Sequence, residues 1–418
     1  MAKPSEHGKI SRKSLLILGI AANISLLGFY KYTDFVIGNV NLAFSQEIPL
    51  LDLTLPLAIS FFTFQQIAYL VDSYRGETQD HDFLHYAVFV TFFPQLIAGP
   101  IVHHKEMMPQ FDNIRNKVIN TNNISKGLFI FSAGLFKKVM IADTFAVWAI
   151  NGFDEAVTLN FIDAWITSLS YSLQLYYDFS GYTDMAIGAA LFFNIKIPIN
   201  FNSPYRALDI QDFWRRWHIT LSRFLRDYVY IPLGGNRQGH FKTYTNLMAT
   251  FLIGGLWHGA GWTFIFWGFL HGLAIVIHRI WRSFGFSCNK VLAWFITFNF
   301  VNIAWVFFRA KSWPDAIKVL RGMFGFEDII LPQIFAEKLA WLTSVKMSFS
   351  NDFISLSTIN DQFASALTCV VILVLIIKWM FNRYSFKGTV IDSVANSFMF
   401  IVAIFFLVRE SEFLYFGF

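Results

Sequence analysis

Charged residues are scarce in this sequence. Asp, Glu, Lys and Arg make up 15% of the 418 residues, against about 25% in soluble domains. Hydrophobic residues make up 55%, Phe alone occurs 50 times, and the mean hydropathy is +0.47. A soluble domain of this length needs a charged surface that this composition does not supply, and a disordered chain needs low hydrophobicity. The remaining class is a polytopic membrane protein.

Cysteine and the common nucleotide and hydrolase motifs are also rare or missing. The two cysteines are Cys288 and Cys369, and Cys369 lies in an apolar run, so no disulfide framework is expected. The sequence contains no Walker A loop, no G-x-G-x-x-G and no G-x-S-x-G motif. His103 and His104 are adjacent, which is a poor spacing for chelation, so we expect no metal site and no bound cofactor.

Long apolar runs dominate what is present. Residues 1–13 are polar and basic, and the apolar run 14–30 follows without a small-residue cleavage site, so it is interpreted as a retained helix. Further apolar runs lie at 54–72, 85–102, 127–150, 161–180, 185–199, 243–257, 261–278, 291–308, 364–381 and 393–409. No repeat or soluble domain interrupts them, which predicts one membrane-embedded, all-α domain over residues 1–418.

The distribution of loop charge predicts an orientation. The chain has 33 Lys and Arg against 28 Asp and Glu, an excess that fits cytoplasmic loops and lipid contact rather than nucleic-acid binding. Loops 103–126, 201–242 and 279–290 are rich in Lys and Arg, so they are predicted to be cytoplasmic, like the N-terminus. Loop 151–160 carries only acidic charge and loop 309–363 is long and charge-balanced, so both are predicted to be extracytoplasmic.

If every apolar run crossed the membrane, loops 103–126 and 201–242 could not both be cytoplasmic. Runs 85–102 and 185–199 are therefore predicted to be re-entrant on the cytoplasmic side. The first contains the helix breakers Pro94, Gly99 and Pro100, and the second is long enough for only about 22 Å of helix against a core of about 30 Å. Broken backbone at membrane depth must be buried in protein or line a cavity, so we expect a cavity within the bilayer.

The densest polar stretch is 213–228, which is interpreted as one amphipathic helix. Its apolar face comprises Trp214, Trp217, Leu221, Phe224, Leu225 and Tyr228, and the arginines 215, 216 and 223 fall largely elsewhere. One interpretation is an interfacial helix whose arginines are solvated or lie near lipid phosphate. His218 lies beside the apolar face, where it is either a hydrogen-bonded packing residue or part of a site.

His258 lies among small residues in the stretch 254–261, after an apolar run of about 15 residues that ends within the membrane by helix rise. An ionisable residue at that depth is a functional candidate, although histidine also joins helices to one another. A buried neutral imidazole can take a proton from a hydroxyl or thiol and return it to a leaving group. For His271, in the returning run, packing is the favoured interpretation.

Two carboxylates, Asp178 and Asp184, lie in an otherwise apolar region. They must pair or line water. A structural role is one interpretation, either as caps of a broken segment or as partners of the arginines of 215–226. A transporter would use similar broken helices and buried charges, but the sequence has no internal repeat.

At these motifs the sequence resembles the membrane-bound O-acyltransferase (MBOAT) family, and within it the alginate O-acetylation (AlgI) subgroup. The matching stretches are 92–102 (FFPQLIAGPIV), 177–184 (YDFSGYTD), 202–206 (NSPYR), 212–222 (DFWRRWHITLS), 226–228 (RDY), 230–237 (YIPLGGNR), 255–259 (GLWHG), 305–309 (WVFFR) and 412–418 (EFLYFGF). Together they cover most of the chain, from about residue 15 to the end. Relatives of this type carry more apolar sequence before the region matching Ser14, so we expect either a start inside a longer gene or the absence of a peripheral helix pair.

The resemblance implies an MBOAT-type helical bundle around a central tunnel. It assigns His258 to the family's near-invariant histidine, as general base, and His218 to the second polar position of the active site, where it orients the donor or the acceptor. It also suggests which residues line the tunnel or bind the donor: Trp257, Asp178, Asp184, Asp212, Arg215, Arg216 and Arg226. Cationic groups near a cytoplasmic entrance suit the phosphates of acetyl-CoA, which is the expected acyl donor.

The resemblance further implies a multi-pass protein of the bacterial inner membrane that moves acetyl groups outward. There an extracytoplasmic acetyltransferase-like partner would pass them to a polysaccharide such as alginate, cellulose, another exopolysaccharide or peptidoglycan. A related alternative is transfer of D-alanyl or another acyl group to teichoic acid or lipid. An alternative of another class is a non-catalytic conduit or scaffold of a polysaccharide export complex.

Overall fold

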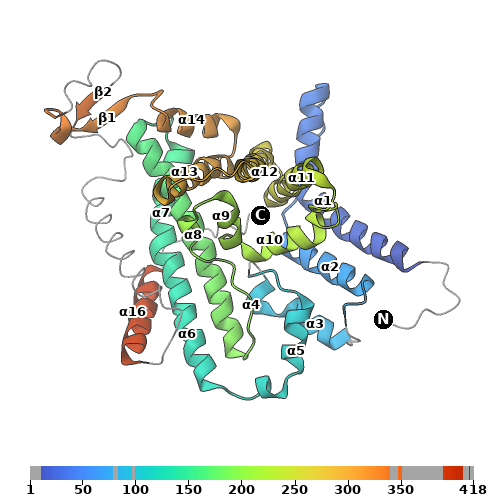
Figure 1. Ribbon diagram of the computed structural model, residues 1–418. Helices are drawn as coiled ribbons and strands as arrows, with labels where there is room; N and C mark the ends of the chain where they lie inside the picture. The colour runs from blue at the N-terminus through green and yellow to red at the C-terminus, as the bar shows by residue number, and fades with distance from the viewer. Residues whose placement is uncertain are drawn as a thin grey trace. The chain divides into compact units, whose positions relative to one another are not determined.

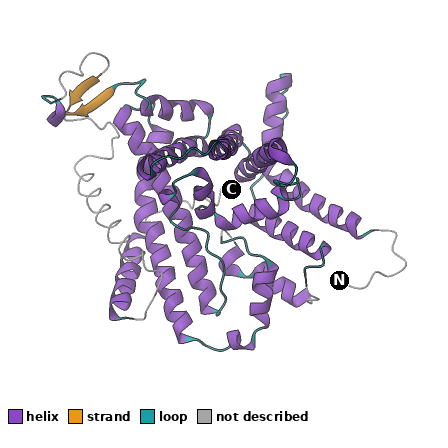
Figure 2. Ribbon diagram, in the orientation of Figure 1, coloured by secondary structure: helices purple, strands orange, loops and turns teal. Residues whose placement is uncertain are grey.

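The computed structural model describes residues 11–78, 83–96, 99–338, 347–350, 389–407 and 414. Helices account for most of these residues (Figures 1 and 2). In the described part of the chain the strands are β1 (Ile329–Pro332) and β2 (Met347–Ser350), which pair in parallel with Ile329 opposite Met347. The prediction of an all-α polytopic architecture is confirmed. The apolar run 364–381, Cys369 and most of the stretches 1–13 and 412–418 lie outside the described residues.

The chain divides into two compact units. Described residues within 1–131, 182–287 and 412–418 form the first unit, and those within 132–181 and 288–411 form the second. Two helices, α6 (Thr121–Phe136) and α8 (Phe161–Phe192), contribute residues to both units. The single domain over 1–418 stays a prediction.

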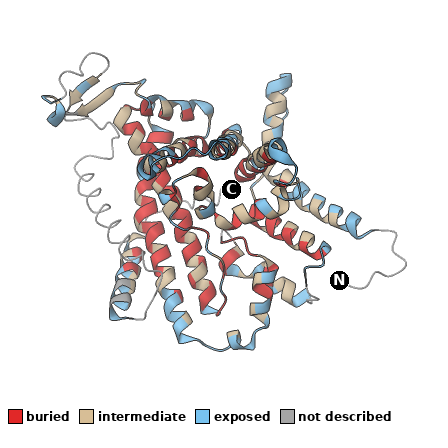
Figure 3. Cartoon of the chain, in the orientation of Figure 1, coloured by how far each residue is buried: buried red, intermediate tan, exposed pale blue. Residues whose placement is uncertain are grey.

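The first unit holds the motifs around both histidines. Its remaining elements are α1 (Arg12–Phe44), α2 (Ile59–Tyr74), α3 (Phe83–Thr91), α4 (Phe93–Leu96), α5 (His104–Asp112), η1 (Ile114–Lys117), η4 (Pro204–Arg206), α9 (Ile210–Arg216), α10 (Ile219–Leu225), the π-helical turn η5 (Arg226–Tyr230), α11 (Gly239–His258) and α12 (Trp262–Ser283). Buried residues are frequent on α2, α8 and α10, whereas α9 buries Ile210 and Phe213 (Figure 3). Both histidines are buried as well.

The second unit continues α6 through the π-helical turn η2 (Lys137–Ala142), α7 (Asp143–Ile150) and η3 (Asn151–Glu155). It also contains α13 (Lys290–Arg309), α14 (Trp313–Met323), β1, η6 (Gln333–Phe335), β2 and α16 (Val390–Phe406). The interval 309–363, which the sequence predicts to be a long extracytoplasmic loop, thus contains a helix and a small parallel sheet among its described residues.

Among the described residues, three helices are long and apolar enough to span a membrane: α1, α12 and α13. They correspond to the predicted runs that begin at residues 14, 261 and 291. Their length follows from the need for about 20 apolar residues to cross the hydrocarbon core.

Run 185–199 is not a separate re-entrant segment, and that prediction is wrong. Helix α8 continues without a break from Phe161 to Phe192. Thr183 and Asp184 lie between the predicted runs 161–180 and 185–199, and both are buried within this helix. Polar side chains interrupt an apolar run in the sequence, but they do not interrupt a helix whose backbone hydrogen bonds are internal.

Run 85–102 is broken as the sequence predicts. Helix α3 ends at Thr91, α4 is a single turn, and residues 99–103 are not helical. The freed backbone finds partners on α10: the Ile101 amide donates to Thr220 Oγ1 (3.0 Å), and Arg223 donates to the Ile101 carbonyl (3.4 Å). A non-helical backbone is thus satisfied inside the protein, as burial away from water requires.

Candidate active site

The stretch 213–228 is not one helix. Helix α9 ends at Arg216, α10 begins at Ile219, and His218 stands between them with a left-handed backbone (φ 42°). A non-glycine residue in this conformation is strained and must be held by its surroundings. The predicted single apolar face over 214–228 is therefore wrong, and the break turns His218 into the protein interior, where it is 0% exposed.

The preceding extended segment holds this break in place. The backbone amide of Asn202 donates to the carbonyl of Arg216 (2.9 Å), and the amide of Ile219 donates to the carbonyl of Asn200 (3.0 Å). These contacts satisfy backbone groups that a continuous helix would have satisfied internally. The sequence pattern within 213–228 cannot reveal them, because their partners lie near residue 200.

The side chain of Asn200 organises the start of α10. Its Oδ1 accepts hydrogen bonds from the Thr220 amide (3.1 Å) and from the Thr220 hydroxyl (2.7 Å), and it lies 3.3 Å from Nδ1 of His218. Because a backbone amide is only a donor, the atom that faces Thr220 must be the oxygen of Asn200. An oxygen accepts, so His218 carries its proton on Nδ1 and presents the lone pair of Nε2 to the other side.

His258 is the last residue of α11. Small residues let α11 and the returning α12 come close at this level: a Cβ on Gly255 would meet the Phe264 carbonyl and Gly268, and a Cβ on Gly259 would meet the Phe264 ring. The helix therefore ends inside the protein, and His258 is 2% exposed. His258 is thus buried among small residues, while its depth within the membrane stays a prediction.

The fold brings the two predicted histidines together, although 40 positions separate them in the sequence. The imidazole rings of His218 and His258 lie 6.4 Å apart, centroid to centroid. Trp257 packs near both, at 6.3 Å from His218 and 4.9 Å from His258, and Trp267 meets His258 edge-on at 5.2 Å. Two buried imidazoles of this spacing can share a small reacting group between them.

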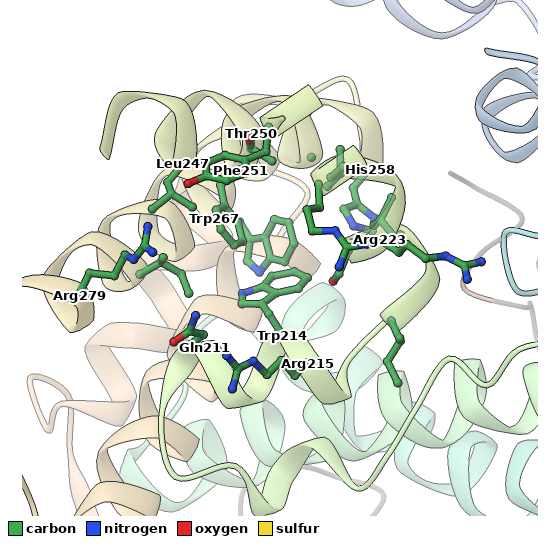
Figure 4. A pocket seen from close by; sticks show the side chains of 18 residues that line it. Gln211, Trp214, Arg215, Arg223, Leu247, Thr250, Phe251, His258, Trp267 and Arg279 are labelled. Atoms are coloured by element: carbon green, nitrogen blue, oxygen red, sulfur yellow. The ribbon is translucent and has the colours of Figure 1, made fainter. Parts of the chain in front are cut away.

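A pocket of about 550 Å³ opens beside His258 (Figure 4). Its lining includes His258, the indoles of Trp214 and Trp267, and four arginines, namely Arg215, Arg223, Arg226 and Arg279. In Figure 4 the two indoles lie between Arg279 at one end and His258 with Arg223 at the other. An apolar cavity with a few cationic groups and one imidazole is a typical arrangement for a small-molecule site.

Two of the four arginines form ion pairs with carboxylates in the described part of the chain, and two do not. Arg223 pairs with Glu106 (Nη2 to Oε2, 3.0 Å) and Arg226 pairs with Asp227 (2.7 Å). The hydrogen bond with Asp227 raises the pKa of Arg226 above its ordinary value. Arg215 and Arg279 make no ion pair with any described residue, so their charges are available to an anion in the pocket.

The other predicted site residues divide into two groups. Arg216 pairs with Asp212 on the same helix (2.9 Å), and neither lines the pocket, while Trp257 packs between the histidines. Asp178 belongs to the second unit and pairs with Lys138 (2.8 Å), and Asp184 is buried on α8. The interpretation of Asp178 as a partner of the arginines 215–226 is wrong, because its cation comes from η2.

Sequence reasoning missed Asn200, Trp267 and Arg279 as site residues. Asn200 was a polar residue after an apolar run, and nothing in its neighbourhood marks it as a partner of His218. Arg279 was assigned only to a basic loop. His271, predicted to be a packing residue, accepts a hydrogen bond from Trp214 (3.2 Å) within the aromatic cluster, in agreement with that role.

The adjacent histidines 103 and 104 lie in a polar cluster around Asp72. His104 Nδ1 is 3.5 Å from Asp72, and the hydroxyl of Tyr228 donates to Asp72 (2.8 Å). No group of three or more His, Cys, Asp or Glu in the described part of the chain is placed to hold a metal ion.

Membrane-length helices, a buried histidine pair and an arginine-lined pocket together define an integral membrane enzyme. The sequence profile of the membrane-bound O-acyltransferase family matches residues 72–312. The chain belongs to this family and is a membrane-embedded acyltransferase.

Characterised relatives agree with this assignment. The chain is 53% identical to a peptidoglycan O-acetyltransferase of Helicobacter pylori, over 96% of this chain and 82% of that protein. It is 41% identical to the probable alginate O-acetylase AlgI of Pseudomonas putida, over 78% of this chain and 68% of that protein. A teichoic acid D-alanyltransferase of Streptococcus thermophilus is 26% identical over 60% of this chain. The resemblance to the AlgI subgroup is confirmed, and the D-alanyltransferases are more distant.

Proposed function

We propose that this protein is a multi-pass acyltransferase of the bacterial inner membrane that moves acetyl groups from a cytoplasmic donor across the bilayer, for O-acetylation of an extracytoplasmic polysaccharide. Peptidoglycan is the first candidate acceptor, because the relative that shares 53% identity over nearly the whole chain is named for it. Alginate-like exopolysaccharide is the second, since the AlgI relatives share about 40% identity.

The observation that carries the proposal is the convergence of His218 and His258 beside the pocket. Their rings lie 6.4 Å apart, and His258 also lines the pocket that contains Arg215 and Arg279. The same few residues thus offer proton transfer and an anion site. A scaffold or conduit has no need of an imidazole that both lies beside a second imidazole and lines a pocket with two arginines outside any ion pair with a described residue.

The chemistry assigned to the pair is general base catalysis. His258 takes the proton of an acceptor hydroxyl as its oxygen attacks the carbonyl carbon of the acetyl thioester. The C–S bond then breaks, and the thiolate receives that proton back from His258. His218, with its proton on Nδ1, presents the lone pair of Nε2 and orients the donor or the acceptor through a group other than the attacking hydroxyl, whose single proton goes to His258.

The donor is proposed to be acetyl-CoA. Its phosphates would contact Arg215 and Arg279, whose guanidinium groups make no ion pair with any described residue, and its acyl end would reach His258 along the indoles of Trp214 and Trp267. Arginine suits phosphate because its planar fork donates two parallel hydrogen bonds. An extracytoplasmic acetyltransferase-like partner is proposed to receive the acetyl group and to pass it to the polymer.

The experiment compares O-acetyl content of peptidoglycan and of exopolysaccharide in cells that make the wild-type protein, the His258→Ala protein or none, at equal protein levels in the membrane. We expect His258→Ala cells to match cells without the protein, with acetyl lost from one polymer, which then identifies the acceptor. Asn289→Ala, at an exposed helix cap on α13, is the matched control and should retain wild-type acetylation.

Three other outcomes would each contradict part of the proposal. If acetyl is unchanged in all strains, the acetylation assignment fails, and the D-alanine content of teichoic acid or lipid becomes the assay. If acetyl falls only without the protein, the protein acts as a conduit or scaffold and His258 is not catalytic. If purified protein transfers acetyl from another thioester but not from acetyl-CoA, the donor assignment fails alone.

A further inference from the structure

The C-terminal end of α11 needs partners for its backbone. The last four backbone carbonyls of a helix have no N–H donor within the helix itself. In α11 these are the carbonyls of residues 255–258, at the end of the helix that carries His258; Gly255, Trp257 and His258 are buried and Leu256 is exposed. The Gly255 carbonyl accepts from the amide of Gly259 (3.4 Å), which leaves three carbonyls to be satisfied.

Two consecutive residues of α1 supply all three partners. The hydroxyl of Tyr32 donates to the Leu256 carbonyl (2.7 Å). The ammonium of Lys31 donates to the carbonyls of Trp257 (2.6 Å) and His258 (3.2 Å). Helix α11 is therefore capped by another helix, more than 220 residues earlier in the chain.

Lys31 is an unusual residue for its position. It lies near the middle of α1, one of the three helices in the described chain that are apolar and long enough to span a membrane. A charge placed there is costly and marks a functional position. None of the ion pairs between described residues involves Lys31, so its partners are neutral dipoles, and the negative end of the α11 dipole faces its charge.

The third N–H group of the Lys31 ammonium donates a hydrogen bond to a residue of α2. Lys31 donates to Ser60 Oγ (3.1 Å), and Ser60 in turn accepts from the Trp257 indole through its carbonyl (3.4 Å). An ammonium has three donors, and here each has one acceptor. The next residue, Phe61, lies 6.5 Å from the His218 ring and 5.3 Å from Trp257. The Lys31 side chain thus connects α1 and α2 to the C-terminal end of α11, where His258 lies.

We propose that Lys31 is a positioning residue for acyl transfer: from α1 it caps the end of α11 and so holds His258 at its working distance from His218. The proposal rests on the proposed function for its kinetic consequence, but the cap itself can be measured without activity. Small displacements of a catalytic group cost large factors in rate, so a cap at the catalytic residue acts mainly on turnover.

The test uses the purified full-length protein in detergent, with Lys31→Met and Lys31→Arg. Lys31→Met keeps the stem and removes every donor, whereas Lys31→Arg keeps the charge and the donors. Lys13→Met is the matched control, because it is the same change at an exposed position of the same helix. Two quantities are measured: amide hydrogen exchange of peptides that cover residues 255–259, and kcat and KM for acetyl transfer from acetyl-CoA.

For Lys31→Met we expect exchange at residues 256–259 to become about 10-fold faster. We expect kcat to fall about 10- to 100-fold with an unchanged KM for acetyl-CoA. Lys31→Arg should recover part of both losses, and Lys13→Met should resemble the wild type. If Lys31→Met does not accumulate in the membrane, Tyr32→Phe removes a single cap and carries the exchange measurement, with a smaller increase expected.

Wild-type exchange at residues 256–259 in Lys31→Met would overturn the cap. Faster exchange with a normal kcat would overturn the positioning role, while an inactive His258→Ala would leave the proposed function intact. If the wild-type protein itself transfers no acetyl group, faster exchange still supports the cap, and the failure belongs to the proposed function alone.

Discussion

The orientation of each histidine ring depends on a few neighbouring residues. Asn200 Oδ1 holds the start of α10 through Thr220 and fixes the proton of His218 on Nδ1. His258 depends instead on the glycines that let α11 and α12 meet. The two imidazoles are therefore oriented by different means, one by a hydrogen-bond acceptor and one by close backbone packing.

Removal of the Asn200 acceptor should misorient His218. We expect Asn200→Ala to lower kcat about 10-fold or more and to destabilise the protein by about 1–3 kcal/mol, because the Thr220 amide becomes a buried donor without an acceptor. Kinetics and thermal unfolding in detergent measure both effects, with Asn122→Ala, at an exposed position of α6, as the control. In the wild type, ¹⁵N NMR of labelled histidine should show His218 protonated on Nδ1, and an Nε2-protonated signal would contradict the assignment.

Helix ends, rather than helix interiors, build the site at the scale of elements. His218 stands at the junction of α9 and α10, and His258 ends α11. Arg215 comes from the last turn of α9, and Arg279 from the last third of α12. Helix ends leave backbone groups unpaired, so each end requires a partner from elsewhere, and those partners fix the positions of the site residues.

The arginines from α9 and α12 should govern donor binding. We expect the double variant Arg215→Gln and Arg279→Gln to raise the KM for acetyl-CoA about 10-fold, because two phosphate contacts are lost, with little change in kcat. Added salt should raise the wild-type KM and affect the double variant less. Arg282→Gln, at an exposed position of the same α12, serves as the control. An equal fall in kcat with unchanged KM would instead place these arginines in the chemical step.

At the scale of the whole molecule, each compact unit carries its own polar network. In the first unit the network surrounds the histidines. In the second, Lys138 pairs with Asp143 (2.7 Å) and Asp178 (2.8 Å), and Asp154 binds Arg309 and Lys311. We expect changes in the second network to act on stability, because its members pair with one another.

Stability of the second unit should fall in acid. Burial of Asp154 opposes its ionisation, but hydrogen bonds and charges from Arg309 and Lys311 outweigh this and lower the pKa of Asp154 below its ordinary value. A lowered pKa in the folded state means that the stabilisation is present above the ordinary pKa and is lost as pH falls through the folded value. Asp154→Asn should therefore cost about 1 kcal/mol at pH 7, and the cost should shrink below about pH 4.

Thermal unfolding of the detergent-solubilised protein across this pH range measures the difference between Asp154→Asn and the wild type. Glu155→Gln, the adjacent exposed carboxylate, is the control and should have little effect at any pH. A constant difference between Asp154→Asn and wild type from pH 7 to pH 3 would show that the ion pairs are not its cause.

Much of this could be predicted from the sequence, for identifiable reasons. The membrane class follows from composition, the helix runs from apolar length, and the break in 85–102 from Pro94, Gly99 and Pro100. Motifs around His218 and His258 placed both in one family and predicted that they act together. The loop orientation and the re-entrant depth of 85–102 stay predictions, as do the donor and the partner.

The tertiary structure alone decided how those residues meet. The helix break at His218 depends on Asn200, the cap of α11 depends on Lys31 and Tyr32, and the continuity of α8 contradicts the separate short segment predicted at 185–199. Composition, apolar length and local motifs act within a few turns of chain, so the sequence by itself determined the class, the helices and the chemistry-bearing residues. Hydrogen bonds between distant segments have no local signature, because any buried polar group is satisfied by whichever partner the fold brings to it.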